Sequence, residues 1–182
     1  MTPSIPTLET PRLILRAPRA EDFPPFAEFY ASDRASFVGG PLTPEGSWRM
    51  LAMEIGHWAL KGFGRWIAET RDTGEPVGLI GLFAPEGWPE PEIGWDLFNG
   101  HEGRGYATEA ALHARAYAYD VLGWQTAISL VKPGNEKNPP PSPPGWARGP
   151  TATLPTNATG SCMSGATRPP SELADGGMEA YA

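Results

Sequence analysis

The chain has 182 residues, 40% of them hydrophobic, with a formal net charge of −7 and one cysteine, Cys162, so its length suits one domain with a sizeable core. The acidic balance argues against a nucleic-acid partner and favours a cationic substrate such as an amine, while the lone cysteine supports neither a disulfide framework nor a zinc site. Because the N-terminus lacks a basic segment followed by an apolar run, and no apolar stretch could span a bilayer, we expect a cytoplasmic protein without a membrane partner. The three histidines lack the spacing of metal ligands, so no bound metal is expected.

The first third of the chain predicts a strand and two helices. Residues 7–18 alternate apolar with basic side chains and end at a proline, which is typical of an amphipathic edge strand with solvated arginines. Glu21 and Asp22 begin a helix through Phe23, Phe26, Phe29 and Tyr30. Thr43 or Ser47 caps a second helix. Its apolar faces are expected to carry Trp48, Leu51, Met53, Ile55, Trp58 and Leu60.

The middle of the chain predicts an antiparallel meander. Residues 63–70 and 76–84 are predicted strands on either side of the turn at 71–75, whose Asp and Gly indicate a hairpin. A loop too rich in proline to continue a strand then leads to another strand at 92–98.

Residues 100–124 run from a glycine-rich turn into an alanine-rich helix. Gly103 and Gly105 flank Arg104, so the turn can take backbone angles barred to other residues and present its N–H groups to a phosphate. With a further strand at 127–132, the order is that of a βαβ unit, which binds anions at the start of its helix. The spacing excludes a P-loop and lacks the third glycine of the dinucleotide fingerprint, so another phosphorylated cofactor is expected. The apolar face of the helix is expected to carry Ala110, Ala111, Ala114, Ala118 and Val121.

The turn and its surroundings resemble the GNAT acetyltransferases, and within them the RimJ/RimL-like branch that acetylates N-termini of ribosomal proteins. The family motif Gln/Arg-x-x-Gly-x-Gly/Ala is similar to residues 102–107. The first position departs from the motif because it holds Glu102. We expect this departure to matter little, since backbone amides make most of the contacts to the phosphate. The Thr-Glu-Ala at 108–110 and the Thr-x-Arg-Leu-x-Leu-Arg pattern at 10–16 are also similar to this branch, so the resemblance covers residues 7–136.

This resemblance implies a fold and a reaction. The fold is α+β, with a mixed, mostly antiparallel sheet and helices on both of its faces. The reaction is acetyl transfer from acetyl-coenzyme A to a primary amine, either a protein N-terminus or a small molecule, by direct attack in a ternary complex. Whether the chain forms a homodimer stays open.

The resemblance also implies binding positions for the cofactor. The pyrophosphate would lie in the glycine turn, with Arg104 pairing to phosphate, and the pantetheine arm between the strands at 92–98 and 127–132, where backbone amides hold it. Tyr106 either covers the pyrophosphate or simply packs, and Asn135 either touches the arm or is only a turn residue. The expected cofactor-binding residues are Leu97, Phe98, Gly103, Arg104, Gly105, Tyr106, Ala107, Thr108 and Asn135.

Glu92 is the candidate general base, acting directly or through water, because it stands at the start of the strand beside the glycine turn. The alternative is a solvated carboxylate at the end of a loop. Asp96 is a weaker rival, since the period-two alternation of a strand puts it on the same face as Glu92. By resemblance, Phe37, Trp48 and Trp58 are candidate walls of the acceptor site.

The composition changes after residue 136. Residues 137–170 hold nine prolines, and Leu154 is their only Leu, Ile, Val or Phe, which is typical of a disordered tail. We favour a frameshift instead, because a shifted reading of the codons permits a helix that the family has at this point, and residues 171–182 then return to the original frame. If the tail is genuine, the acetyltransferase domain at 1–136 lacks its last helix and closing strands. The alternative function is then a catalytically impaired protein that binds coenzyme A in a non-enzymatic role.

Overall fold

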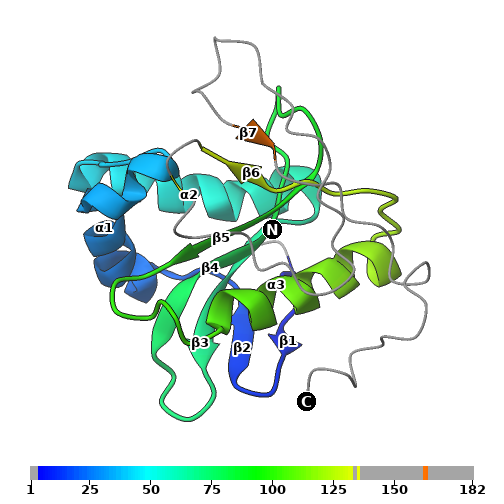
Figure 1. The fold of residues 1–182 in the computed structure, drawn as a ribbon, viewed down its shortest axis with the longest axis horizontal. Coiled ribbons are helices and arrows are strands. Elements are labelled where there is room, and N and C mark those ends of the chain that lie inside the picture. Colours follow the sequence, from blue (N-terminus) through cyan, green and yellow to red (C-terminus); the bar gives the residue numbers. More distant parts are fainter. Residues whose placement is uncertain (1–3, 133–134, 136–161, 164–182) are drawn as a thin grey trace.

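The computed structural model describes residues 4–132, 135 and 162–163. Within them the chain forms an α+β fold in which a sheet carries helices on both faces (Figure 1). The predicted fold class is therefore confirmed. The proline-rich segment at 137–170 and the tail at 171–182 lie outside the described residues, apart from Cys162 and Met163.

The main sheet has five strands, each antiparallel to the next in chain order. They are β1 (Leu8–Glu9), β2 (Leu13–Arg16), β3 (Arg65–Thr70), β4 (Pro76–Phe83) and β5 (Glu92–Leu97). The pairing of β3 with β4 confirms the hairpin predicted around 71–75. Most residues of β3 and β4 are buried whichever way they point, because helices cover both faces of the sheet.

The N-terminal segment is a hairpin, not the single edge strand expected at 7–18. The Thr10 hydroxyl accepts a hydrogen bond from the Leu13 N–H (2.8 Å) and closes the turn of this hairpin. Because β1 pairs with one edge of β2 and β3 with the other, β2 is an inner strand. The expectation of solvated arginines is wrong for Arg16, whose side chain is only 11% exposed. Its guanidinium donates twice to Asp22 (2.7 and 2.8 Å) and pairs with Glu69, and these ion pairs replace its hydration.

The helices divide the core into two layers. The helices α1 (Phe23–Ala31) and α2 (Pro44–Lys61) lie on one face of the sheet, and α3 (Tyr106–Ala116) lies on the other (Figure 1). The first layer contains Phe26, Phe29, Tyr30, Leu51, Ile67 and Leu79. The second packs the small side chains of α3 against Leu13, Leu15, Trp66, Ile80 and Leu82. Alanines at these positions let α3 approach the sheet closely, as the sequence predicts.

Thr43 caps α2, because its hydroxyl accepts from the Gly46 N–H (3.2 Å). Of the apolar residues expected along α2, Trp48 and Leu60 are 53% and 85% exposed. The buried stripe of this helix follows three-and-four spacing through Ser47, Leu51, Glu54 and Trp58, and the two exposed side chains lie off that stripe.

The end of α3 departs from regular helix. Ala110, Ala111, Ala114 and Ala118 are fully buried, as predicted, but Val121 is 65% exposed. Residues 117–121 form a π-helical turn, which has more residues per turn than an α-helix. The apolar spacing therefore shifts, and Leu122 and Trp124 pack against the core in place of Val121.

After α3 the chain runs beside the start of β5. In the strand predicted at 127–132, Ile128 forms a parallel bridge with Glu92, and the Ile93 N–H donates to the Ile128 carbonyl (2.8 Å). Beyond this bridge, β6 (Leu130–Val131) pairs antiparallel with β7 (Cys162–Met163). Parallel pairing is thus limited to one bridge, and the rest of β5 has no strand on its outer edge among the described residues.

Candidate functional site

Two adjoining cavities lie along this outer part of β5. The first, which we call the turn cavity, has a volume of about 370 Å³ and lies between the glycine turn and the connection from α1 to α2. The second, which we call the acidic cavity, has a volume of about 300 Å³ and lies between α2 and β5, with Glu92 and Asp96 in its wall. Both cavities are lined by Phe37, Val38, Trp95, Asp96 and Asn135.

The glycine turn has the backbone conformation that the sequence predicts. Gly103 and Gly105 have φ angles of 73° and 80°, in the left-handed region that favours glycine, and Gly105 is the N-cap of α3. Both glycines line the turn cavity together with Ala107 and Thr108. Arg104 is exposed and does not line the turn cavity. The turn thus offers the cavity mainly backbone and small side chains at the start of a helix.

The glycine turn is tied to the N-terminal hairpin by Glu109, in the first turn of α3. Its carboxylate accepts from the Thr10 hydroxyl (2.5 Å), the Arg12 N–H (2.8 Å) and the Arg12 Nε (2.6 Å). Arg12 also donates to the Arg104 carbonyl (2.9 Å) and lies over the Tyr106 ring, 5.0 Å from its centroid. Burial alone raises the pKa of Glu109, but these hydrogen bonds outweigh burial and lower it. Tyr106 therefore packs under Arg12, and its expected place over the pyrophosphate stays a prediction.

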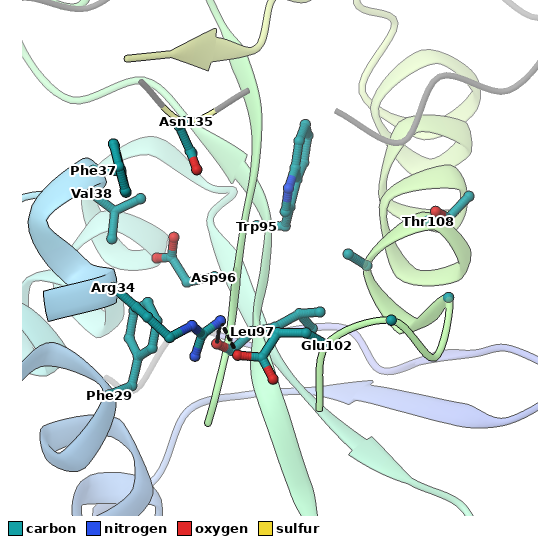
Figure 2. A pocket seen from close by; sticks show the side chains of 13 residues that line it. Phe29, Arg34, Phe37, Val38, Trp95, Asp96, Leu97, Glu102, Thr108 and Asn135 are labelled. Carbon is teal, nitrogen blue, oxygen red and sulfur yellow. Dashed lines mark hydrogen bonds and ion pairs between the residues drawn. The ribbon is translucent and has the colours of Figure 1, made fainter. Parts of the chain in front are cut away.

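An ion pair joins the two walls of the turn cavity. Arg34, from the connection between α1 and α2, contacts the Glu102 carboxylate at 2.5 Å (Figure 2). The same guanidinium donates to the Leu97 carbonyl (3.1 Å) and to the Asn99 side chain (2.8 Å). The acidic departure from the family motif thus has a cationic partner, which the sequence analysis did not identify.

Of the two backbone amides expected to hold the cofactor arm, those of Leu97 and Phe98, the second is used inside the sheet. The Phe98 N–H donates to the Val77 carbonyl (3.0 Å), and its side chain is buried in the core. Because neighbouring residues of a strand direct their N–H groups to opposite edges, Trp95 and Leu97 direct theirs to the outer edge. Both residues line the turn cavity. Period-two alternation from Leu97 would have identified Trp95, which the sequence analysis missed.

Glu92 lies where β5 and the chain after α3 meet. Its side chain accepts from the Trp88 Nε1 (2.8 Å) and the Leu130 N–H (3.0 Å), and the residue is only 8% exposed. The alternative of a solvated carboxylate is therefore wrong. Burial raises the pKa of Glu92, although these two hydrogen bonds oppose the shift.

Asp96 belongs to a buried ion cluster beneath the acidic cavity. Its Oδ2 accepts from Tyr30 (2.9 Å) and from Arg65 (2.8 Å), and Arg65 also pairs with the fully buried Glu54. Burial favours neutral Arg65, but the two carboxylates overcome it and raise the pKa of Arg65. Burial, followed by the charge of Asp96, raises the pKa of the Tyr30 hydroxyl. The Asp96 Oδ2 is thus engaged by two donors from inside the fold.

Two of the aromatic residues expected in the acceptor site lie elsewhere. Trp58 is buried in the core and donates to the Arg65 carbonyl (3.0 Å), while Trp48 packs against Phe23 near the surface. Phe37 does line both cavities. Within the described part of the chain, no cluster of side chains is suited to a metal ion, and no helix is long and apolar enough to cross a membrane.

Comparisons with known proteins agree on the domain. The profile of the family described as "Acetyltransferase (GNAT) domain" matches residues 12–138. The uncharacterized N-acetyltransferase YoaA of Bacillus subtilis (strain 168) is 30% identical over 136 residues, which are 72% of this chain and 76% of that protein. An acetyltransferase from Agrobacterium tumefaciens str. C58 has a similar structure, with a TM-score of 0.78, 36% identity, and coverage of 88% of this chain and 94% of that one. A ribosomal-protein-S5-alanine acetyltransferase from Vibrio fischeri shares the fold at a TM-score of 0.68 and 15% identity, over 90% and 97% of the two chains.

Proposed function

The chain belongs to the GNAT acetyltransferase family, and on that basis we propose that it transfers acetyl from acetyl-coenzyme A to a primary amine by direct attack in a ternary complex. The observation that carries this proposal is the meeting of the turn cavity and the acidic cavity at Trp95 and Asp96 of β5. A donor and an acceptor that enter from the two cavities would meet there. The sequence relatives named N-acetyltransferase or acetyltransferase support the same reaction class.

The residues of the turn cavity fit coenzyme A. A Cβ at Gly103 would meet no atom within 4 Å, so the turn has open space on its outer side for a pyrophosphate next to a helix start. The Glu102 carboxylate beside the turn opposes an anion, and Arg34 balances its charge. Gly103, Gly105 and Thr108 would hold the pyrophosphate, with the pantetheine arm beside Trp95 and Asn135. When bound, acetyl-coenzyme A supplies the thioester from which the acetyl group is transferred.

Glu92 is the proposed general base. An amine reacts as the neutral species, so an ammonium that enters the acidic cavity must lose a proton. The Glu92 carboxylate lines that cavity and has a raised pKa, which makes it a stronger proton acceptor than an exposed glutamate. Asp96 lies in the same wall, where its Oδ2 accepts a hydrogen bond from Arg65.

The test compares Glu92→Gln with Glu90→Gln, a change at an exposed glutamate of the same loop. Thiol release from acetyl-coenzyme A and the mass of the acetylated amine are followed over a panel of primary amines. For Glu92→Gln we expect kcat to fall about 10²- to 10⁴-fold, with an unchanged Kd for acetyl-coenzyme A. In the wild type, activity should rise as the pH rises through the raised pKa of Glu92, and Glu92→Gln should lose this dependence.

An unchanged kcat in Glu92→Gln would remove Glu92 from the mechanism. Binding of acetyl-coenzyme A without transfer to any amine of the panel would contradict the proposed reaction and favour the non-enzymatic role. The Glu90→Gln variant is expected to match the wild type in both measurements.

A further inference from the structure

The acidic cavity has a slot between two carboxylates. Glu92, Gly94 and Asp96 alternate along β5 and all line this cavity, which places them on one face of the strand. Gly94 has no side chain, and a Cβ built there would lie 3.8 Å from Glu92 Oε1 with only one other atom, of the same carboxyl group, within 4 Å. The face of β5 between the two acids is therefore open to a small group.

The charges around this slot favour a cation. Arg65 is neutralised by Glu54 and Asp96, and Lys132 donates to the Ser36 carbonyl (3.0 Å). Among the described residues that line the acidic cavity, these are the two cations, and neither forms an ion pair with Glu92. An ammonium group would therefore gain attraction from Glu92 and Asp96, and a carboxylate would be repelled.

The rest of the cavity is mostly apolar. Its walls include Phe37, Met50, Met53, Phe83, Trp88 and Trp95. Aromatic faces also attract cations, and thioether side chains adapt to apolar ligands of varied shape. A volume of about 300 Å³ is at the small end of ligand sites.

From these observations we propose that the acidic cavity binds a small monoamine with an apolar, aromatic-sized body and no carboxylate, and that its ammonium lies at Gly94 between Glu92 and Asp96. This inference rests on the proposed function, since it names the acceptor class of the same reaction. An α-amino acid would bring its carboxylate next to two acids. A diamine would place its second charge among methionines and aromatic rings, and a peptide N-terminus would bury amides against apolar walls.

The first test ranks four probes: 2-phenylethylamine, phenylalanine, 1,4-diaminobutane and an unblocked alanine tripeptide. Binding is measured by calorimetry on the full chain saturated with coenzyme A, and acetylation is measured separately with acetyl-coenzyme A. Because phenylalanine differs from 2-phenylethylamine by one carboxylate, we expect its Kd to be at least about 100-fold higher. The diamine and the tripeptide are expected to bind more weakly than 2-phenylethylamine as well.

Preferential binding and acetylation of phenylalanine, the diamine or the tripeptide would overturn the monoamine class and leave the proposed acetyl transfer intact. If coenzyme A binds and no amine of this set or of a wider panel is acetylated, the proposed function fails, whatever the ranking of the binding constants. The two failures are therefore distinct.

The second test fills the slot. Gly94→Ala adds one methyl group with ordinary contacts, so the fold should persist, but the Kd for 2-phenylethylamine should rise about tenfold. The Kd for acetyl-coenzyme A should not change, because Gly94 lines only the acidic cavity. Gly56→Ala in α2 is the control, since a Cβ there meets nothing within 4 Å. An unchanged affinity for 2-phenylethylamine in Gly94→Ala would place the ammonium elsewhere and overturn the proposed slot.

Discussion

The two cavities on β5 are built from different kinds of parts. One wall of the turn cavity is the glycine turn at 103–108, whose residues are neighbours in the chain. The floor of the acidic cavity joins Tyr30 of α1, Glu54 of α2, Arg65 of β3 and Asp96 of β5. A glycine turn needs only permissive backbone angles, whereas the ion cluster exists only when the whole domain is folded. Substitutions in the ion cluster should therefore mainly lower the stability of the fold, and substitutions in the glycine turn should mainly lower the affinity for the cofactor.

The largest effect is expected from Arg65→Met. The variant keeps much of the side-chain volume but leaves the buried carboxylates of Glu54 and Asp96 without their cation. We expect the free energy of unfolding at neutral pH to fall by about 3–5 kcal/mol, measured by urea denaturation.

The control for this change is Arg49→Met. Arg49 forms an exposed ion pair with Glu45, one turn away on α2, and its loss should change the free energy of unfolding by less than about 0.5 kcal/mol. Equal losses in the two variants would mean that the buried cluster stabilises the fold no more than a surface pair does.

The next largest effect is expected at the turn. Gly103 and Gly123 have similar φ angles of 73° and 70°, and a Cβ at either meets nothing within 4 Å. Gly103→Ala and Gly123→Ala should therefore each cost about 1–2 kcal/mol of stability through backbone strain. Only Gly103→Ala should raise the Kd for acetyl-coenzyme A, by about tenfold, as measured by calorimetry. A similar loss of affinity in Gly123→Ala would show that strain, not position in the turn, sets the affinity.

A smaller effect is expected from Arg12→Gln, which loosens the tie between the N-terminal hairpin and the glycine turn. Arg12 is half exposed, so we expect the KM for acetyl-coenzyme A to rise about three- to tenfold while kcat changes little. Arg49→Gln is the matched change of an arginine far from the turn. A fall in kcat with an unchanged KM would contradict a positioning role for Arg12.

The pH dependence of stability tests the same tie. Because the pKa of Glu109 is lower in the folded protein than its ordinary value of 4.5, Glu109 stabilises the fold above that value. This contribution is lost as the pH falls through the lowered pKa. Glu109→Gln should therefore reduce the pH dependence of the free energy of unfolding on the acid side. An unchanged dependence would show that the bonds of Glu109 contribute nothing to stability.

The smallest effect is expected from Glu102→Gln. This change removes a negative charge from the wall of the turn cavity and frees Arg34 for an anion. The Kd for acetyl-coenzyme A should fall about two- to fivefold, and the gain should shrink at high salt. Weaker binding would mean instead that the ion pair with Arg34 holds the cavity open.

The predictions that succeeded from sequence concern neighbouring residues. The left-handed angles of Gly103, the cap at Thr43 and the hairpin at 71–75 each follow from local chemistry. The bonds of Arg65 to Glu54 and Asp96 span 11 and 31 positions, and no local pattern indicates them.

Two further failures have a physical cause of the same kind. The short parallel contact at Ile128 depends on where β6 finds its partner, and the exposure of Val121 depends on a π-helical turn. Neither feature is indicated by the spacing of apolar residues in the sequence. The buried ion cluster, which the sequence did not indicate, is also the part whose disruption is expected to lower the free energy of unfolding most.

The bond between Thr10 and Glu109 joins residues 99 positions apart. During synthesis the N-terminal hairpin therefore leaves the ribosome long before its partner on α3 exists, and contacts of such sequence separation form slowly. We therefore expect the glycine turn to be anchored late in folding. A ligand that binds only when this contact is closed would stabilise the folded chain by mass action, so chains without it would open more often to proteases.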